Sequence, residues 1–125
     1  MANQNVMGNH VIVDVMEADA ALLDDEVYIK DLLEAAAISV GATILHSHSH
    51  KFSPQGVTAF VMLAESHISI HTWPETGDCA IDCFTCGDAD ARAAADFIVM
   101  GISGWGHNVQ TIVRYKLDDP SILEA

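Results

Sequence analysis

Basic side chains are scarce in this 125-residue chain, in which five Lys and Arg residues accompany 18 Asp and Glu residues for a formal net charge of −13. A field of that sign repels phosphate groups, so we expect neither nucleic acid nor an anionic membrane surface as a partner. Cationic ligands are favoured instead, although the same acidity also serves simply to keep a protein soluble. Charge therefore narrows the class of partner without naming one.

Long apolar runs and paired cysteines are missing as well. No uncharged apolar segment approaches the roughly 20 residues that cross a bilayer, and residues 1–5 have no basic segment leading into an apolar stretch. We therefore expect neither a membrane span nor a signal peptide. The three cysteines, at positions 79, 83 and 86, form an odd and clustered set. That set is unlike a disulfide framework and predicts a reducing, cytoplasmic location.

What the chain does have is apolar content: 50% of its residues are hydrophobic and 18% are charged. This balance excludes a disordered protein and predicts one domain, residues 1–125, with its own core. Predicted strands cover residues 10–16, 42–50, 57–64, 68–73, 79–86 and 108–117. Predicted helices run from residues 24–26 to Gly41 and over residues 89–102. The order β-α-β-β-β-β-α-β predicts an α+β fold, a two-layer sandwich of a mostly antiparallel sheet with helices on one face.

Histidines and cysteines gather between positions 46 and 86. His46, His48 and His50 alternate, so a strand would place them on one face, and His71 could add a fourth imidazole for a tetrahedral zinc ion. Three histidines along one strand are nevertheless splayed rather than convergent, and a second Cys-x-x-Cys pair is missing. A non-enzymatic His/Cys metal-binding domain therefore stays open as an alternative.

The spacing Cys83-x-x-Cys86 also suggests thiol redox chemistry. Such motifs act at a helix N-terminus, where the thiol pKa is lowered, whereas this one lies on a predicted strand. We expect Cys79 and Cys83 to be small buried hydrophobic residues instead.

Three further motifs occur together: AESHISIHTWPE at residues 64–75, FTCG at residues 84–87, and F-x-P-x-G-V-T at residues 52–58. With these motifs the chain resembles the S-adenosylmethionine decarboxylase proenzymes of bacteria and archaea. The resemblance is close over residues 41–87 and rests on the order of elements at the two ends. A twelve-residue motif with matched positions on both sides is far more specific than a lone Cys-x-x-Cys.

The resemblance implies a pyruvoyl enzyme that makes its own cofactor by cleaving between Glu65 and Ser66. The Ser66 hydroxyl would attack the Glu65 carbonyl, and elimination from the resulting ester would leave a dehydroalanine, whose imine form hydrolyses to a covalent pyruvoyl group. The products would be a β chain, residues 1–65, and an α chain, residues 66–125. The pyruvoyl group derived from Ser66 would form a Schiff base with the substrate amine and accept the electrons released with carbon dioxide. No metal is expected.

Three residues match the family's processing and catalytic positions. His71 would be the processing base that removes the Ser66 α-proton, and Thr58 would assist at the scissile carbonyl. Cys86 would be the general acid that protonates the substrate carbon after decarboxylation. Thr58 and Ala59 stand where the family more often has Ser-Gly, which places the substrate in question.

The resemblance also implies a binding site for a cationic nucleoside. Glu75 would hold the ribose hydroxyls, and Phe52 would stack on the adenine, with its π-face also suited to a sulfonium ion. His67, next to the nucleophile, would contact substrate or simply pack. The implied reaction converts S-adenosylmethionine to its decarboxylated form, an aminopropyl donor for spermidine and other polyamines. The same chemistry on ornithine or arginine is the alternative, and a homodimer of cleaved protomers with a shared site is expected.

Overall fold

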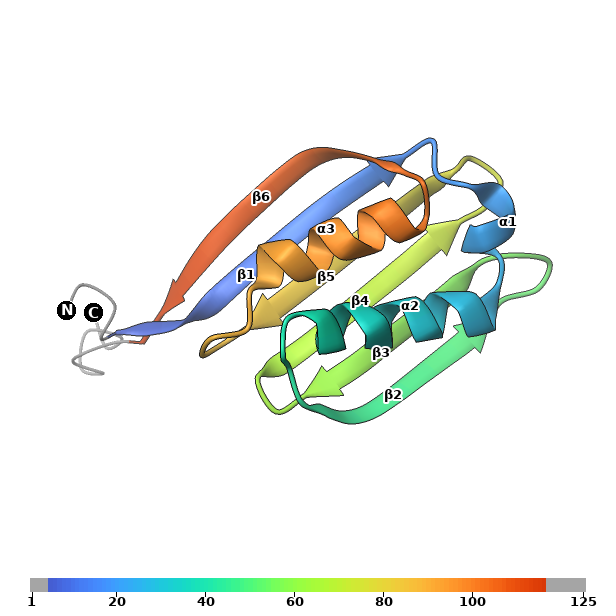
Figure 1. The fold of residues 1–125 in the computed structure, drawn as a ribbon. Coiled ribbons are helices and arrows are strands. Elements are labelled where there is room, and N and C mark those ends of the chain that lie inside the picture. The colour runs from blue at the N-terminus through green and yellow to red at the C-terminus, as the bar shows by residue number, and fades with distance from the viewer. Residues whose placement is uncertain (1–4, 117–125) are drawn as a thin grey trace, which may run out of the picture.

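Six strands form a single antiparallel sheet in the computed structural model, which describes residues 5–116 (Figure 1). The strands are β1 (Val6–Met16), β2 (Ile44–Lys51), β3 (Val57–Leu63), β4 (Ser66–Trp73), β5 (Asp78–Thr85) and β6 (Trp105–Tyr115). The helices are α1 (Ala20–Leu23), α2 (Glu26–Ser39) and α3 (Ala91–Gly101). The strand order is β2-β3-β4-β5-β1-β6, and every neighbouring pair is antiparallel. The predicted α+β fold, with its antiparallel sheet, is confirmed.

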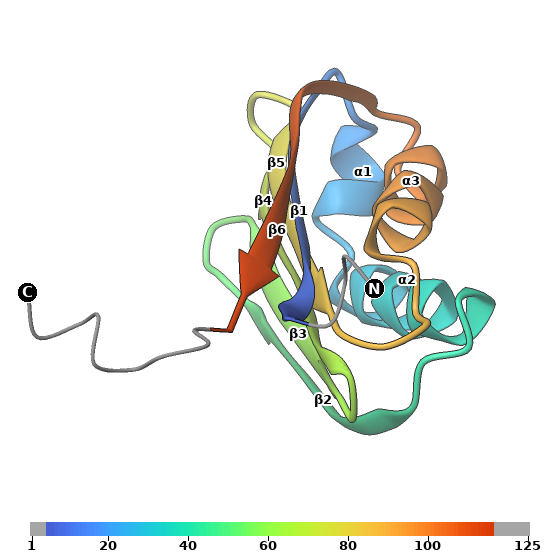
Figure 2. The same cartoon turned by 90° about the vertical axis from the view of Figure 1, so that its left-hand side faces the viewer.

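Both long helices cover the same face of the sheet (Figure 2). Alternate residues of the central strands are buried beneath them, as Val57, Ala59 and Val61 of β3 show. This period of two places one set of side chains in the core and the other on the opposite face. The helices contribute Ile29, Leu33, Ala36, Ala94 and Ile98 to that core. We call the opposite face, which no element of residues 5–116 covers, the open face.

Aspartates begin all three helices. The carboxylate of Asp25 accepts a hydrogen bond from the Tyr28 backbone N–H, and that of Asp90 accepts one from Ala93, both at 3.0 Å. Such N-caps satisfy backbone donors that lack an intrahelical partner. Asp19 caps α1 in the same way, but four residues are too few to produce a helical periodicity, so the sequence does not predict α1.

Several strand boundaries differ from the prediction. β1 begins at Val6 rather than residue 10, and β4 begins at Ser66 itself rather than residue 68. β6 begins at Trp105 rather than residue 108, within a Gly-rich stretch that follows α3. There a Cβ on Gly104 would lie 2.4 Å from Cγ1 of Val15, so this glycine permits close packing of the chain against β1. Position 117, the predicted end of the last strand, lies outside the described residues.

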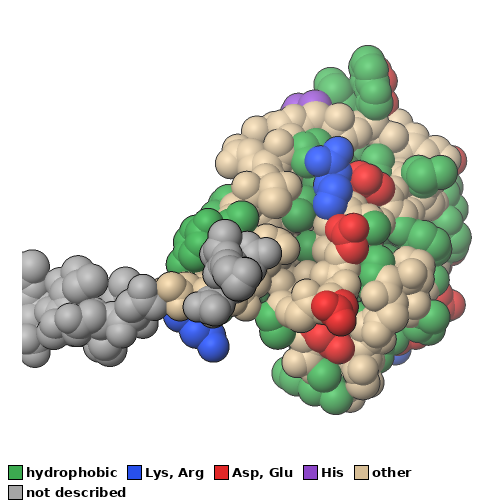
Figure 3. Space-filling view, turned by 60° about the vertical axis from the view of Figure 1, so that its left-hand side comes forward, with side chains coloured by type: hydrophobic (Ala, Val, Ile, Leu, Met, Phe, Trp, Pro, Cys, Tyr) green, Lys and Arg blue, Asp and Glu red, His purple; other side chains and the backbone are tan. Residues whose placement is uncertain are grey.

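Surface charge is dispersed on the side of the molecule drawn in Figure 3. There the Asp and Glu side chains lie in separate spots between hydrophobic and polar surface rather than in one patch. Among residues 5–116 no helix is long and apolar enough to cross a membrane.

Candidate active site

A tight turn joins β3 to β4 and contains the predicted cleavage point. Ala64 and Glu65 form this turn, and Leu63 and Ser66 face each other across it. Ser66 has a φ of 139°, a conformation that is costly for a residue with a side chain. Strain of this kind persists only where the surrounding structure enforces it, and it is frequent at functional sites.

The turn is held from both sides. The Glu65 carbonyl oxygen accepts hydrogen bonds from the backbone N–H of Cys86, at 2.9 Å, and from its Sγ, at 3.2 Å. The Glu65 carboxylate accepts the Thr43 N–H at 3.0 Å, and the Ala64 N–H donates to the Thr43 carbonyl at 2.9 Å. Cys86 reaches this position because Thr85, the last residue of β5, pairs with Ser66. We call Glu65, Ser66 and Cys86 the turn cluster.

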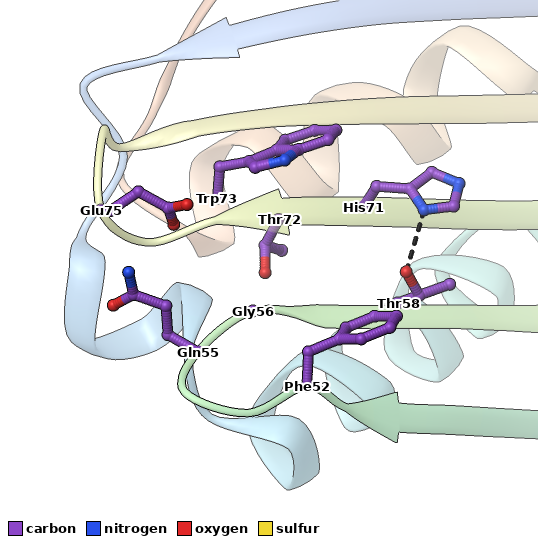
Figure 4. A pocket seen from close by; sticks show the side chains of 8 residues that line it. All are labelled: Phe52, Gln55, Gly56, Thr58, His71, Thr72, Trp73 and Glu75. Carbon is purple, nitrogen blue, oxygen red and sulfur yellow. Dashed lines mark hydrogen bonds between the residues drawn. The ribbon is translucent and has the colours of Figure 1, made fainter.

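A pocket of about 370 Å³ lies at the other end of β3 and β4 (Figure 4). Its lining residues are Phe52, Gln55, Gly56, Thr58, His71, Thr72, Trp73 and Glu75. Thr58 Oγ1 and His71 Nδ1 form a hydrogen bond of 2.9 Å between the two strands. We call Phe52, Thr58, His71 and Glu75 the pocket cluster, because the structure brings these four predicted residues together.

Asp24 anchors the loop that forms one wall of the pocket. Its carboxylate accepts the Gly56 backbone N–H at 2.9 Å and lies 3.0 Å from the Lys51 ammonium. The Gly56 hydrogen bond, assisted by Lys51, holds the pKa of Asp24 below its usual value of 3.8. In sequence Asp24 shows only the signal of a helix start, so its contact with the 52–56 loop could not be predicted.

The two clusters lie apart within one chain. His71 follows Ser66 by five residues along β4, which corresponds to about 16 Å in an extended strand. His67 is the histidine beside the nucleophile, with Nδ1 3.5 Å from the Ser66 hydroxyl oxygen. One protomer therefore does not bring the His71 imidazole to the Ser66 backbone.

The remaining candidate residues take structural or surface positions. Cys79 and Cys83 are buried as predicted, and burial raises the pKa of each thiol to about 12. Cys86 is exposed, and all three cysteines are free. His46, His48 and His50 are exposed along β2. Within the described part of the chain, no three His, Cys, Asp or Glu side chains are grouped so as to hold a metal ion.

Comparison with known proteins agrees with this fold and these motifs. The family model for S-adenosylmethionine decarboxylase matches residues 9–115. The S-adenosylmethionine decarboxylase proenzyme of Prochlorococcus marinus (strain MIT 9211) is 43% identical over 110 residues, which cover 87% of this chain and 90% of that protein. The proenzyme of Synechococcus sp. (strain WH7803) is 52% identical over 83 residues, or 66% of this chain and 65% of the relative's length.

A solved structure extends the match to three dimensions. The crystal structure of the adenosylmethionine decarboxylase from Aquifex aeolicus superimposes with a TM-score of 0.79 and 36% sequence identity, over 93% of this chain and 96% of that one. The fold thus places the chain in the class of small α+β proteins to which this decarboxylase belongs. The chain belongs to the S-adenosylmethionine decarboxylase family, as its motifs indicated.

Proposed function

We propose that this chain is a proenzyme that cleaves itself between Glu65 and Ser66 and then decarboxylates S-adenosylmethionine. The observation that carries the proposal is the turn itself, where a strained Ser66 follows a carbonyl that accepts two hydrogen bonds from Cys86. The relatives named above are called proenzymes, which supports a precursor that is processed.

The turn cluster has the parts that cleavage of a peptide bond requires. The Ser66 hydroxyl is the nucleophile, and the Cys86 donors lie where negative charge develops on the Glu65 oxygen. Attack converts the amide to an ester, and elimination then frees the Glu65 carboxylate and leaves a dehydroalanine at position 66. Water hydrolyses the imine form of this residue, which releases ammonia and leaves a pyruvoyl group at the start of residues 66–125. This group supplies a carbonyl that accepts the electrons released with carbon dioxide. Residue 66, beside Cys86, would hold it.

We infer that two protomers share each site, because the turn cluster and the pocket cluster lie at opposite ends of β4. A two-fold axis through the middle of the open face would place the turn cluster of one protomer against the pocket cluster of its partner. The partner's His71 could then remove the Ser66 α-proton, supported by the partner's Thr58. Apolar side chains partly exposed on the open face support such a contact. They are Phe60, Met62, Trp73, Phe84 and Ile112.

The pocket cluster suits an adenosyl substrate. The Phe52 ring is 46% exposed in one protomer and available to stack on adenine, and the Glu75 carboxylate can accept hydrogen bonds from both ribose hydroxyls. Cys86, exposed beside residue 66, is placed to donate a proton to the substrate carbon. The net charge of −13 favours approach of a sulfonium substrate. The product would serve as an aminopropyl donor in polyamine biosynthesis, and the free thiols suit a cytoplasmic location.

Release of carbon dioxide tests the substrate. Purified protein is supplied with carboxyl-labelled S-adenosylmethionine, ornithine or arginine in separate reactions, and we expect release from S-adenosylmethionine alone. Glu75→Gln should raise KM for this substrate roughly tenfold to a hundredfold, because hydrogen bonds to a charged acceptor are lost. Asp31→Asn, which removes an exposed carboxylate from α2, is the control and should leave KM unchanged.

Two results would contradict this assignment. Release of carbon dioxide from ornithine or arginine but not from S-adenosylmethionine would support the pyruvoyl chemistry and contradict S-adenosylmethionine as the substrate. No release from any of the three, by a protein that instead binds stoichiometric zinc, would favour a His/Cys metal-binding domain.

A further inference from the structure

At the start of β4 the side chains of two consecutive residues, Ser66 and His67, lie close together. Consecutive residues of a regular strand point to opposite faces of the sheet. The positive φ of Ser66 alters this geometry, and the Ser66 hydroxyl oxygen lies 3.5 Å from Nδ1 of His67. The other ring nitrogen of His67, Nε2, lies 3.6 Å from Oδ1 of Asp82 on β5. Serine, imidazole and carboxylate thus follow one another across the open face.

Asp82 is itself fixed by groups from two more strands. Oδ1 of Asp82 lies 2.5 Å from Nε2 of His10 on β1. Arg114 on β6 donates to Nδ1 of His10 at 3.2 Å, so the His10 Nε2–H donates to Asp82. The Arg114 guanidinium also lies 5.6 Å from the centre of the Phe84 ring. The chain Arg114–His10–Asp82–His67 therefore crosses the four neighbouring strands β6, β1, β5 and β4.

His67 has few other charged neighbours in the described part of the chain. Its partners across the sheet are Met62 of β3 and Phe84 of β5, neither of which titrates. Beyond Met62 the same row ends at His46 of β2. The charged or titratable groups that face His67 are therefore Asp82 and His10 on one side, with Arg114 behind them, and His46 beyond Met62 on the other.

We propose that His67 is the general base that takes the hydroxyl proton of Ser66 in the first step of self-cleavage, with Asp82 as its positioning residue. This inference rests on the self-cleavage proposed above. A carboxylate on the Nε2 side favours the tautomer with hydrogen on Nε2, which leaves the Nδ1 lone pair toward Ser66. Both distances exceed those of formed hydrogen bonds, as is common for catalytic groups before reaction.

The step balances without any further reactant. The Ser66 hydroxyl proton passes to Nδ1 of His67 as Oγ bonds to the Glu65 carbonyl carbon, and the Cys86 N–H stabilises the resulting oxyanion. The bond from that carbon to the Ser66 nitrogen then breaks, and His67 returns the proton to the leaving nitrogen. The product is an ester between Glu65 and the Ser66 oxygen. His71, about 16 Å along β4, would act only after this ester has formed.

Cleavage kinetics of the newly made full chain test the assignment. The chain is produced by cell-free translation and sampled over time, with hydroxylamine added to parallel samples because it splits esters but not amides. His67→Gln should cleave on the order of 100-fold more slowly, the loss typical of a missing general base. The uncleaved His67→Gln chain should resist hydroxylamine, whereas His71→Gln should accumulate a chain that hydroxylamine splits.

Further variants test whether His67 acts as a base or only packs against its neighbours. Asp82→Asn should slow cleavage and Asp82→Glu should recover part of the rate, because a carboxylate beside Nε2 of His67 holds the reactive tautomer. His67→Ala should regain cleavage when imidazole is added, which a misfolded chain would not. His107→Gln, an exposed histidine on β6, is the matched control and should cleave at the wild-type rate.

The outcomes distinguish this inference from the proposed function. Cleavage of His67→Gln at the wild-type rate, a hydroxylamine-sensitive ester in that variant, or no effect of imidazole on folded His67→Ala would overturn the role of His67 while self-cleavage stands. A folded wild-type chain that never cleaves would instead overturn the proposed function.

Discussion

Mixed dimers of two inactive variants should recover activity if each site takes residues from two protomers. Ser66→Ala removes the nucleophile from the turn cluster, and His71→Ala removes the imidazole from the pocket cluster. The two positions are five residues, or about 16 Å, apart on β4, so one chain cannot join them without rebuilding the strand. A mixed dimer would nevertheless contain one complete site, made of Ser66 from one protomer and the partner's His71.

The expected recovery follows from symmetry. Random pairing of equal amounts makes about half of the dimers mixed, and each mixed dimer has one complete site of two. Co-expression should therefore restore about a quarter of the wild-type carbon dioxide release. In the same sample roughly half of the His71→Ala chains should be cleaved, and none of the Ser66→Ala chains.

Differently tagged copies, co-expressed and purified through both tags in sequence, isolate the mixed dimer for assay. Each variant expressed alone is the control and should be inactive. Mixed dimers that form but neither cleave nor release carbon dioxide would refute a shared site.

Two more predictions follow from single side chains. Iodoacetamide should label Cys86 alone in the folded chain near pH 8, because burial raises the pKa of Cys79 and Cys83 to about 12. Intact mass should then show a single adduct. Labelling of either buried thiol before unfolding would contradict this packing. For Asp24, whose pKa is lowered in the folded chain, the stabilisation should be complete above its usual value of 3.8 and disappear as pH falls through the lower folded value. Asp24→Asn should therefore melt at a lower temperature than wild type above about pH 5, with a gap that narrows below about pH 4; a constant gap over that range would exclude this carboxylate as its source.

Much of the fold could be predicted because its signals are local. Alternation of apolar residues marks strands such as β3, and aspartate caps mark where α2 and α3 begin. The four-residue helix α1 has no such periodicity. The last strand was predicted to begin at residue 108 rather than 105, because the sequence does not show that Val15 packs against Gly104.

The residues of the candidate site also differ in whether their sequence positions connect them. The motif identified Ser66 and the pocket cluster, since those residues lie close together in sequence. Asp82, His10 and Arg114 could not be connected to His67, because they meet only through the strand order β4-β5-β1-β6. Nor does the spacing of Ser66 and His71 show that an extended strand holds them apart, which is the reason for proposing a site shared by two protomers.

Intact-mass measurement of the purified protein is the decisive test of self-cleavage at the strained turn. We predict two chains, one ending at Glu65 and one beginning with a pyruvoyl group at position 66, and a single uncleaved chain from Ser66→Ala. A folded wild-type protein that remains one chain with an unmodified Ser66 would contradict it.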